Sequence, residues 1–284
     1  MARGLDHIVH AVADLDSAAD IYRRLGFTVG ARNRHPWGTH NHIIQLPGFF
    51  IELLTLAEPD KMSGDLFSAM FASYNREFIT RGDGLSMLVL ESKDAQADEA
   101  AFRASGIAAA VATRFDREGK KPDGTPVHVA FTLAFAKDAG AHDARFFTCQ
   151  QHYPENFWNP AFQQHANGVR GIAGVVLAAD RPAQHRDFML AFTGAATARD
   201  ESGGFSIDLP RGAVSVLTPQ TFIDRFGQHP PVTERGPRLA ALRFKTANPA
   251  AAGAQLEKAG VFFTPLKAGA ISAAVLGAIL IFEP

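Results

Sequence analysis

The sequence predicts an α+β fold built from four β-α-β-β-β modules, arranged as two tandem domains of two paired modules each. Two observations support this prediction: one pattern recurs four times, and strand-like stretches follow each copy. Each copy starts with an apolar strand, passes an Asp or Asn, runs through a short helix and ends at Gly. The copies are LDHIVHAVADLDSAADIYRRLGF, LSMLVLESKDAQADEAAFRASGI, IAGVVLAADRPAQHRDFMLAFTGA and LAALRFKTANPAAAGAQLEKAGV.

Helix ends recur at matching places in the four copies. An Asp or Asn at the start can accept hydrogen bonds from the free N–H groups of the first helical turn. The candidate caps are Asp14, Asp94, Asp180 and Asn248. A Gly at the end suits the left-handed residue that closes many helices. The candidate closing residues are Gly26, Gly106, Gly194 and Gly260, which lie 12 residues after the cap in copies one, two and four and 14 in copy three.

Strand-like stretches complete each module. In the first module FTVGARNRH, HNHIIQL and FFIELLTL read as three strands. Aromatic residues at helical spacing predict a helix within 59–81, joining modules one and two. The apolar stretch 268–282 is too short for a membrane span, so we expect two buried strands there, with a tail anchor as the alternative. The Pro- and Asn-rich stretch 152–168 separates the predicted domains 1–158 and 168–284.

Composition narrows the function classes. The chain has a formal net charge of −1, with no run of basic residues, which argues against nucleic acid as a partner. Cys149 is the single cysteine, so no internal disulfide can form, which suits a cytoplasmic location. No export signal or membrane partner is expected. The sequence also lacks a Gly-rich phosphate loop and a G-x-S-x-G nucleophile turn.

The repeat resembles the vicinal-oxygen-chelate superfamily, also called the glyoxalase/bleomycin-resistance/extradiol-dioxygenase fold. The resemblance covers most of the chain and is clearest in the first copy with the FFIELL that follows it. The stretches RHPWGTHNHIIQL and FFTCQQHYPENFW resemble glyoxalase-like domain proteins in particular. The resemblance implies that paired modules form curved sheets around a divalent metal ion, whose ligands come from the first and last strands of each module.

The resemblance places His7 and Glu52 at ligand positions in the first module. Both are ordinary metal ligands, and both interrupt apolar strands where a buried polar group needs a partner. The alternative is a hydrogen-bonded core histidine, and a Glu52 paired with Arg32 or Arg34. The resemblance leaves the metal open as Zn, Ni, Mn or Fe.

The other modules lack a matching pair. The position of His7 holds Met87 in module two, Ala173 or Val175 in module three and Ala241 in module four, and that of Glu52 holds Ser215 in module three. In module four Glu283 is a possible match for Glu52. We therefore expect the second domain to be a structural copy without the site.

The last strand of module two leaves two alternatives for completing the site. One register points Cys149 and Gln151 inward, which makes Gln151 a substrate contact. The other points Gln150 and His152 inward, which makes His152 the third metal ligand.

The loop 33–42 is predicted to lie at the rim of the first domain. Thr39 and Asn41 would share one face of the following strand and orient a polar ligand, while His40 would face away. His35 is a candidate general acid or base because its reference pKa lies near neutrality. Trp37 is a candidate cover for the ligand, and the alternative is a polar hairpin that caps the sheet.

Three functions fit these observations. The first is a metal-dependent lyase or isomerase that acts on a small molecule with vicinal oxygens, with Glu52 or His35 moving the proton. The second is a metal-independent protein that binds or sequesters a small molecule, as in bleomycin resistance. The third is a ring-cleaving dioxygenase, which would need a second histidine where Met87 stands. The chain would act as a monomer or homodimer, because tandem pairing completes each site within one chain.

Overall fold

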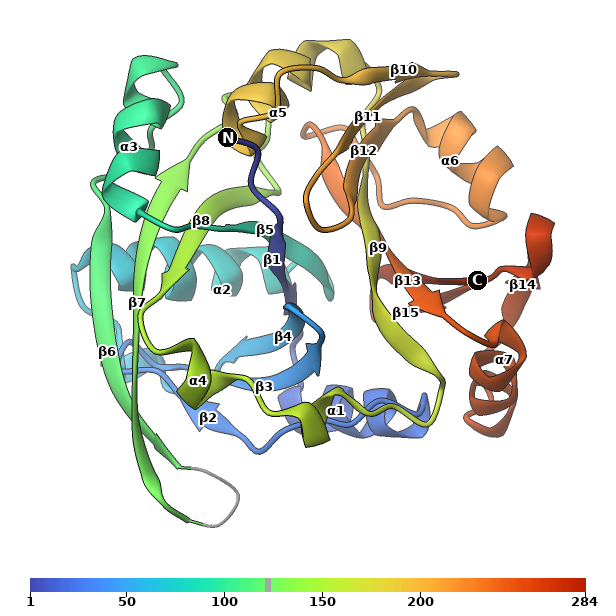
Figure 1. Cartoon of the computed structure of the whole chain (residues 1–284), viewed down its shortest axis with the longest axis horizontal. Coiled ribbons are helices and arrows are strands. Elements are labelled where there is room, and N and C mark those ends of the chain that lie inside the picture. The colour runs from blue at the N-terminus through green and yellow to red at the C-terminus, as the bar shows by residue number, and fades with distance from the viewer. Residues whose placement is uncertain (121–123) are drawn as a thin grey trace.

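The computed structural model describes residues 1–120 and 124–284, which form two curled eight-stranded sheets (Figure 1). The first sheet consists of β1 (Leu5–Ala11), β2 (Asn33–Arg34), β3 (Thr39–Leu46), β4 (Phe49–Leu56), β5 (Gly84–Glu91), β6 (Thr113–Lys120), β7 (Pro126–Ala136) and β8 (Arg145–Gln151). The second consists of β9 (Val169–Ala178), β10 (Arg199–Glu201), β11 (Gly204–Asp208), β12 (Ala213–Leu217), β13 (Arg238–Thr246), β14 (Phe263–Pro265), β15 (Ile271–Val275) and β16 (Ala278–Glu283). The predicted fold class is confirmed.

Each sheet joins two modules through their first strands. The strand orders are β2-β3-β4-β1-β5-β8-β7-β6 and β10-β11-β12-β9-β13-β16-β15-β14. The first strands of paired modules, β1 with β5 and β9 with β13, run antiparallel. Within each module the first strand runs parallel to the last, as β1 does to β4. Residues from two separate modules therefore meet at the centre of each sheet.

The module helices begin and end largely where the sequence predicts. They are α1 (Leu15–Arg24), α3 (Ala95–Ala104), α5 (Arg186–Thr193) and α7 (Pro249–Lys258). The side chains of Asp14, Asp94 and Asn248 accept backbone N–H groups of the first turn of α1, α3 and α7. All four predicted closing glycines have positive φ, from 68° to 82°.

The third module departs from the predicted helix start. A 3-10 turn, η4 (Pro182–His185), precedes α5, and the Asp180 side chain accepts a hydrogen bond from Thr233 Oγ1 at 2.5 Å. The cap prediction for Asp180 is therefore wrong. The extra turn also accounts for the two additional residues between Asp180 and Gly194.

The remaining short helices connect modules or domains, except for η5, which lies between β14 and β15 in module four. They are η1 (Pro59–Lys61), the π-helix η2 (Ser68–Ser73), α2 (Tyr74–Ile79), α4 (Pro154–Phe157), η3 (Pro160–Gln163), α6 (Pro219–Phe226) and η5 (Lys267–Gly269). The helix predicted within 59–81 is present as η2 and α2. The stretch 27–32, predicted as strand, is irregular, and only Asn33–Arg34 pairs with β3.

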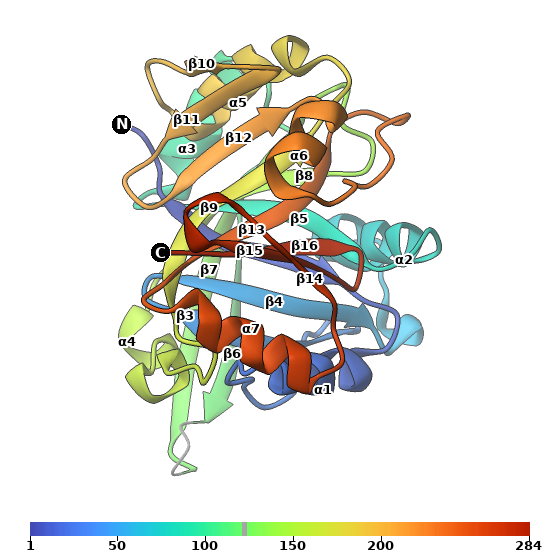
Figure 2. The same cartoon turned by 90° about the vertical axis from the view of Figure 1, so that its right-hand side faces the viewer.

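The two sheets contact each other through their central strands β5 and β13, and the helix pairs α3–α5 and α1–α7 flank that contact (Figures 1 and 2). Phe102 of α3 contacts Phe192 of α5 with ring centroids 5.9 Å apart. One apolar cluster accordingly runs from Ile8 of β1 to Val175 of β9. Separate apolar clusters fill the opposite faces of the two sheets. That face of the first sheet, called the concave face below, carries the site.

The apolar stretch near the end of the chain forms the hairpin β15–β16. Its turn is Leu276–Gly277, where both residues have positive φ. The two predicted buried strands are therefore present. Among the described residues, no helix combines the length and apolar character that crossing a membrane requires.

Candidate functional site

His7 and Glu52 share the concave face of two neighbouring strands. In the parallel pairing of β1 with β4, His7 lies opposite Phe50 and Val9 lies opposite Glu52. Side chains two residues apart on a strand point to the same face. The His7 ring stacks on Phe50 with centroids 4.2 Å apart. His7 and Glu52 are 5% and 6% exposed and line one cavity.

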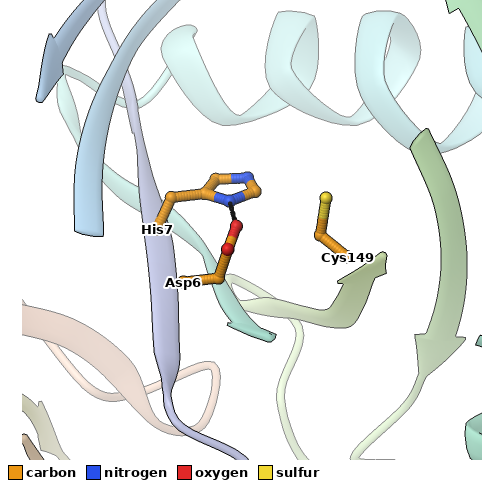
Figure 3. A group of neighbouring side chains, drawn as sticks. All are labelled: Asp6, His7 and Cys149. Carbon is orange, nitrogen blue, oxygen red and sulfur yellow. Dashed lines mark hydrogen bonds and ion pairs between the residues drawn. The ribbon is translucent and has the colours of Figure 1, made fainter. Parts of the chain in front are cut away.

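The Asp6 carboxylate orients the His7 ring through a hydrogen bond. Leu5 pairs with Leu90 and His7 with Val89, so Asp6 is an extra residue that forms a bulge in β1. Bulges bend a strand and re-aim its side chains. The Asp6 carboxylate lies 2.6 Å from His7 Nδ1, which must donate the hydrogen bond (Figure 3). That bond fixes the tautomer and leaves the Nε2 lone pair available.

Glu52 is a buried carboxylate whose charge is incompletely balanced. Its Oε1 accepts a hydrogen bond from Asn41 Nδ2 at 2.5 Å. No described Lys or Arg lies within ion-pair distance of it. Burial raises the pKa of Glu52, although the nearby charge of His7, the Asn41 bond and the charge of Arg117 oppose the shift. The site therefore favours either a proton on Glu52 or an added cation beside it.

The loop before β3 brings three of its predicted residues to the cavity. His35, Trp37 and Asn41 line it, and His35 stacks on Trp37 with centroids 4.7 Å apart. Thr39 shares the face of Asn41 but bonds to His35 Nδ1 at 2.8 Å. His35 Nε2 lies 3.9 Å from Glu52 Oε1.

His35 does not titrate near neutrality, contrary to the sequence-based expectation. Burial, reinforced by the charges of Arg117 and His40, lowers the pKa of His35 to about 3. A neutral imidazole with so low a pKa is a weak base at physiological pH. We therefore assign His35 to the wall of the cavity rather than to proton transfer.

Other loop residues lie outside the cavity. As predicted, His40 faces away, bonding to Glu58 at 2.7 Å. Arg32 is exposed and pairs with Asp16, while Arg34 is also exposed. Neither arginine pairs with Glu52, so that alternative is wrong.

The last strand of module two adopts the register that points Cys149 inward. Cys149 lines the cavity, and its Sγ belongs to a group with ligand atoms of Asp6 and His7 that all lie within 4.8 Å of one another (Figure 3). Gln151 donates to Asp6 Oδ1 at 3.0 Å and supports the Asp6–His7 pair rather than lining the cavity. His152 bonds to Thr132 at 2.7 Å and is not brought to the cavity, so we leave it out of the site.

Strand pairing shows which residues stand in place of His7 and Glu52 in modules two and four. In module two Met87 pairs with Arg145 and Val89 with Phe147, so Phe147, not Cys149, occupies the position that corresponds to Glu52. In module four Ala241 pairs with Ile279, which places Ile281 at that position. Glu283 instead forms an ion pair with Arg243 at 2.9 Å.

Seven of the fifteen residues that line the cavity are Phe or Trp. The free space is about 50 Å³, enough for a group of a few non-hydrogen atoms. Arg117 of β6 adds a cation that no sequence pattern singles out, because β6 reads as a polar hairpin strand. The aromatic lining residues are Trp37, Phe50, Phe71, Phe115, Phe131, Phe147 and Phe157.

Three side chains offer donors for a divalent metal: His7 through Nε2, Glu52 through its carboxylate and Cys149 through Sγ. A carboxylate behind a ligating imidazole is the usual second layer of such sites, and Asp6 supplies it. The thiol is the weakest of the three donors, since burial and the charges of Asp6 and Glu52 raise the pKa of Cys149. Among the described residues, the ligand atoms that lie within 4.8 Å of one another are those of Asp6, His7 and Cys149, and Glu52 lines the same cavity outside that group. These donor types fit a divalent ion.

Comparisons with known proteins agree with this architecture. The family model described as "Glyoxalase-like domain" matches residues 5–192, so the chain belongs to that family. No curated protein matches the chain.

Solved structures extend the similarity over the whole fold. A hypothetical protein from Staphylococcus aureus is 14% identical, with a TM-score of 0.69 and 99% of each chain covered. A mutant of 4-hydroxymandelate synthase from Streptomyces coelicolor is 12% identical, with a TM-score of 0.58 over 99% of this chain and 92% of the other. A xylose isomerase-like TIM barrel/4-hydroxyphenylpyruvate dioxygenase fusion protein is 15% identical, with a TM-score of 0.54 over 99% and 49%.

Proposed function

We propose that this protein is a divalent-metal-dependent lyase or isomerase that acts on a small molecule with vicinal oxygens. The reaction takes place in the cavity on the concave face of the first sheet. The observation that carries the proposal is the placement of His7 and Glu52 on adjacent strands, facing one cavity, with Asp6 fixing the tautomer of His7. An imidazole and a carboxylate buried in one cavity, with no described Lys or Arg in ion-pair contact with the carboxylate, are typical of a cation site.

Each residue has a distinct part in this proposal. His7 and Glu52 hold the ion, and Asp6 orients the His7 ring. When bound, the ion supplies Lewis acidity toward the vicinal oxygens of the substrate. Glu52 also moves a proton, because it is a carboxylate that lines the cavity where the substrate would react. The aromatic wall excludes water from the reacting group.

Metal content tests this proposal. Purified wild-type protein is expected to retain or take up about one divalent ion per chain, measured by plasma mass spectrometry after removal of loosely bound metal. His7→Ala and Glu52→Ala should each lose it. His185→Ala is a matched control, since His185 is also buried and also lies 2.6 Å from a carboxylate, that of Asp138, away from the cavity. Metal bound equally by all four proteins would contradict the proposal.

A metal-independent binding protein is the second candidate. Met87 and Phe147 stand where a second pair of ligands would be, and the wall is largely apolar. This candidate is favoured if no preparation binds a divalent ion while the cavity still takes up a small apolar molecule.

Ring-cleaving chemistry, suggested by the dioxygenase names among the similar structures, would need two histidines, and Met87 replaces one of them.

A further inference from the structure

A second, larger cavity adjoins the one that holds His7 and Glu52. Its volume is about 390 Å³, and it shares Ile43, Arg117 and Phe157 with the inner cavity. These three residues therefore stand between an inner space for a few atoms and an outer groove large enough for a ring system. The lining of the groove is mixed, with Val127, Val129, Phe157 and Phe162 on the apolar side and Asn33, Gln45 and Asn156 on the polar side.

Arg117 stands at this boundary without a fixed partner. No hydrogen bond or ion pair involves its side chain within the described residues, although the side chain is partly buried. The other arginines without such a partner there are all exposed: Arg24, Arg34, Arg76, Arg170 and Arg181. A partly buried guanidinium has lost water contacts, and only a counter-charge or hydrogen-bond acceptors replace them fully.

Glu52 is the acidic residue whose charge acts on Arg117, but it does not form an ion pair with Arg117. The two groups influence each other electrostatically, yet they lie beyond ion-pair distance. Glu52 is instead bonded to Asn41 at 2.5 Å. Arg117 thus presents its charge to whatever molecule occupies the boundary between the cavities.

Trp37 offers a second unused donor. Its Nε1 is buried and has no hydrogen-bond partner, and the residue lines the inner cavity. A buried N–H without an acceptor is costly, so an oxygen atom of a ligand would stabilise it. The inner cavity therefore presents unused donors among aromatic rings.

We propose that Arg117 binds the carboxylate of the substrate at the boundary between the two cavities, and that the substrate is an organic carboxylate with a flat apolar body lying in the outer groove. This proposal rests on the proposed function, because the inner cavity beyond Arg117 is its reaction site. A guanidinium pairs with a carboxylate through two parallel hydrogen bonds. A single arginine in an apolar setting suits one negative charge rather than the double charge of a phosphate monoester.

Binding of two probes of equal size tests the proposal. Isothermal titration calorimetry would compare 2-naphthoate with the neutral 2-naphthamide, using the full chain before and after dialysis against EDTA. Wild-type protein should prefer the carboxylate by about tenfold or more in both states. Arg117→Gln should lose that preference while still binding the amide, and Arg117→Lys should keep part of it.

Two further variants test whether the carboxylate preference belongs to Arg117 and whether the ring system lies in the groove. Arg114→Gln removes an exposed arginine of the same strand, already paired with Asp116, and should leave the preference unchanged. Phe162→Ala should weaken both probes alike, because it shortens the wall of the groove that holds the ring system.

The possible results separate this proposal from the proposed function. A preference that disappears with EDTA but survives Arg117→Gln would mean that a metal, not Arg117, binds the carboxylate; the arginine subsite is then wrong, while the metal site stands. Equal binding of both probes to wild-type protein, or no binding of either, would also overturn the arginine subsite. A preference lost in Arg117→Gln but unaffected by metal removal supports it.

Discussion

The Asp6 carboxylate and the His7 imidazole, neighbours in the chain, are joined by a 2.6 Å hydrogen bond on a bulge of β1. In a regular strand their side chains would point to opposite faces. The bulge therefore brings the Asp6 carboxylate to the His7 ring, and the bond to Nδ1 leaves Nε2 available. The first prediction tests this arrangement.

Asp6→Asn is predicted to weaken metal binding about 10- to 100-fold, the usual cost of losing the carboxylate behind a ligating histidine. Titration of metal-free protein with Zn²⁺ against a competing chelator would measure the affinity. Asp138→Asn changes the equivalent carboxylate of the Asp138–His185 pair and should leave the affinity unchanged. An equal loss in both variants would show that the effect is structural.

Glu52→Gln is predicted to stabilise the metal-free protein at neutral pH, because it removes a buried charge. The pKa of Glu52 is raised above its usual value of 4.5, so ionisation costs the folded state, and stability falls as pH rises through that raised pKa. Urea unfolding should show the gain at about pH 7.5 and its disappearance at about pH 4. Glu283→Gln, which breaks the Arg243 ion pair, should not stabilise. A less stable Glu52→Gln protein at neutral pH would argue that a fixed cation already balances Glu52.

His35→Gln is predicted to reduce the loss of stability in acid. The pKa of His35 is about 3 in the folded chain against a usual 6.5, so the unfolded chain takes up a proton first. Stability therefore falls as pH drops from 6.5 toward 3, and this residue contributes on the order of 3 kcal/mol of that loss at about pH 4.5. Urea unfolding between these pH values would measure the slope. His128→Gln should not flatten it, since carboxylates raise the pKa of His128.

Met87→His is predicted to tighten metal binding by about tenfold, which corresponds to about 1.4 kcal/mol. Met87 lies opposite Val9 in the antiparallel pairing of β1 with β5, at the position in module two that corresponds to His7. A histidine there would add a ligand from the second module. Ala241→His introduces the same residue at the matching position of the second domain, where no carboxylate corresponds to Glu52, and should not create a comparable site. An unchanged affinity in Met87→His would place the ion away from the centre of the sheet.

Local chemistry made the fold predictable from the sequence. Capping by Asp14, Asp94 and Asn248 and the positive φ of four glycines mark helix ends that depend on a few neighbouring residues. Asp180 was predicted wrongly because Thr233, far away in the chain, takes its side chain as a hydrogen-bond acceptor. The stretch 27–32 is irregular although Gly30 N donates to Ile43 O of β3 at 2.9 Å, since regular pairing with β3 is confined to Asn33–Arg34, which residue pattern alone does not reveal.

The site was less predictable than the fold. Alternation along a strand predicted that Asn41 faces the cavity and His40 faces away. Alternation did not indicate the role of Asp6, because the bulge that re-aims it depends on pairing with β5. It did not indicate Arg117 either, because β6 lies at the edge of the sheet and reaches the site only through the curvature of the sheet. The low pKa of His35 follows from burial among residues distant in sequence, which a reference value does not include.

Anomalous diffraction from crystals grown with Zn²⁺ or Mn²⁺ tests the central claim most directly. We predict one peak bonded to both His7 Nε2 and the Glu52 carboxylate, at about 2.0–2.2 Å for Zn²⁺, with Asp6 still hydrogen-bonded to His7 Nδ1. A peak bonded to only one of the two residues would contradict the account. So would an ion found instead at a surface pair such as His40 and Glu58.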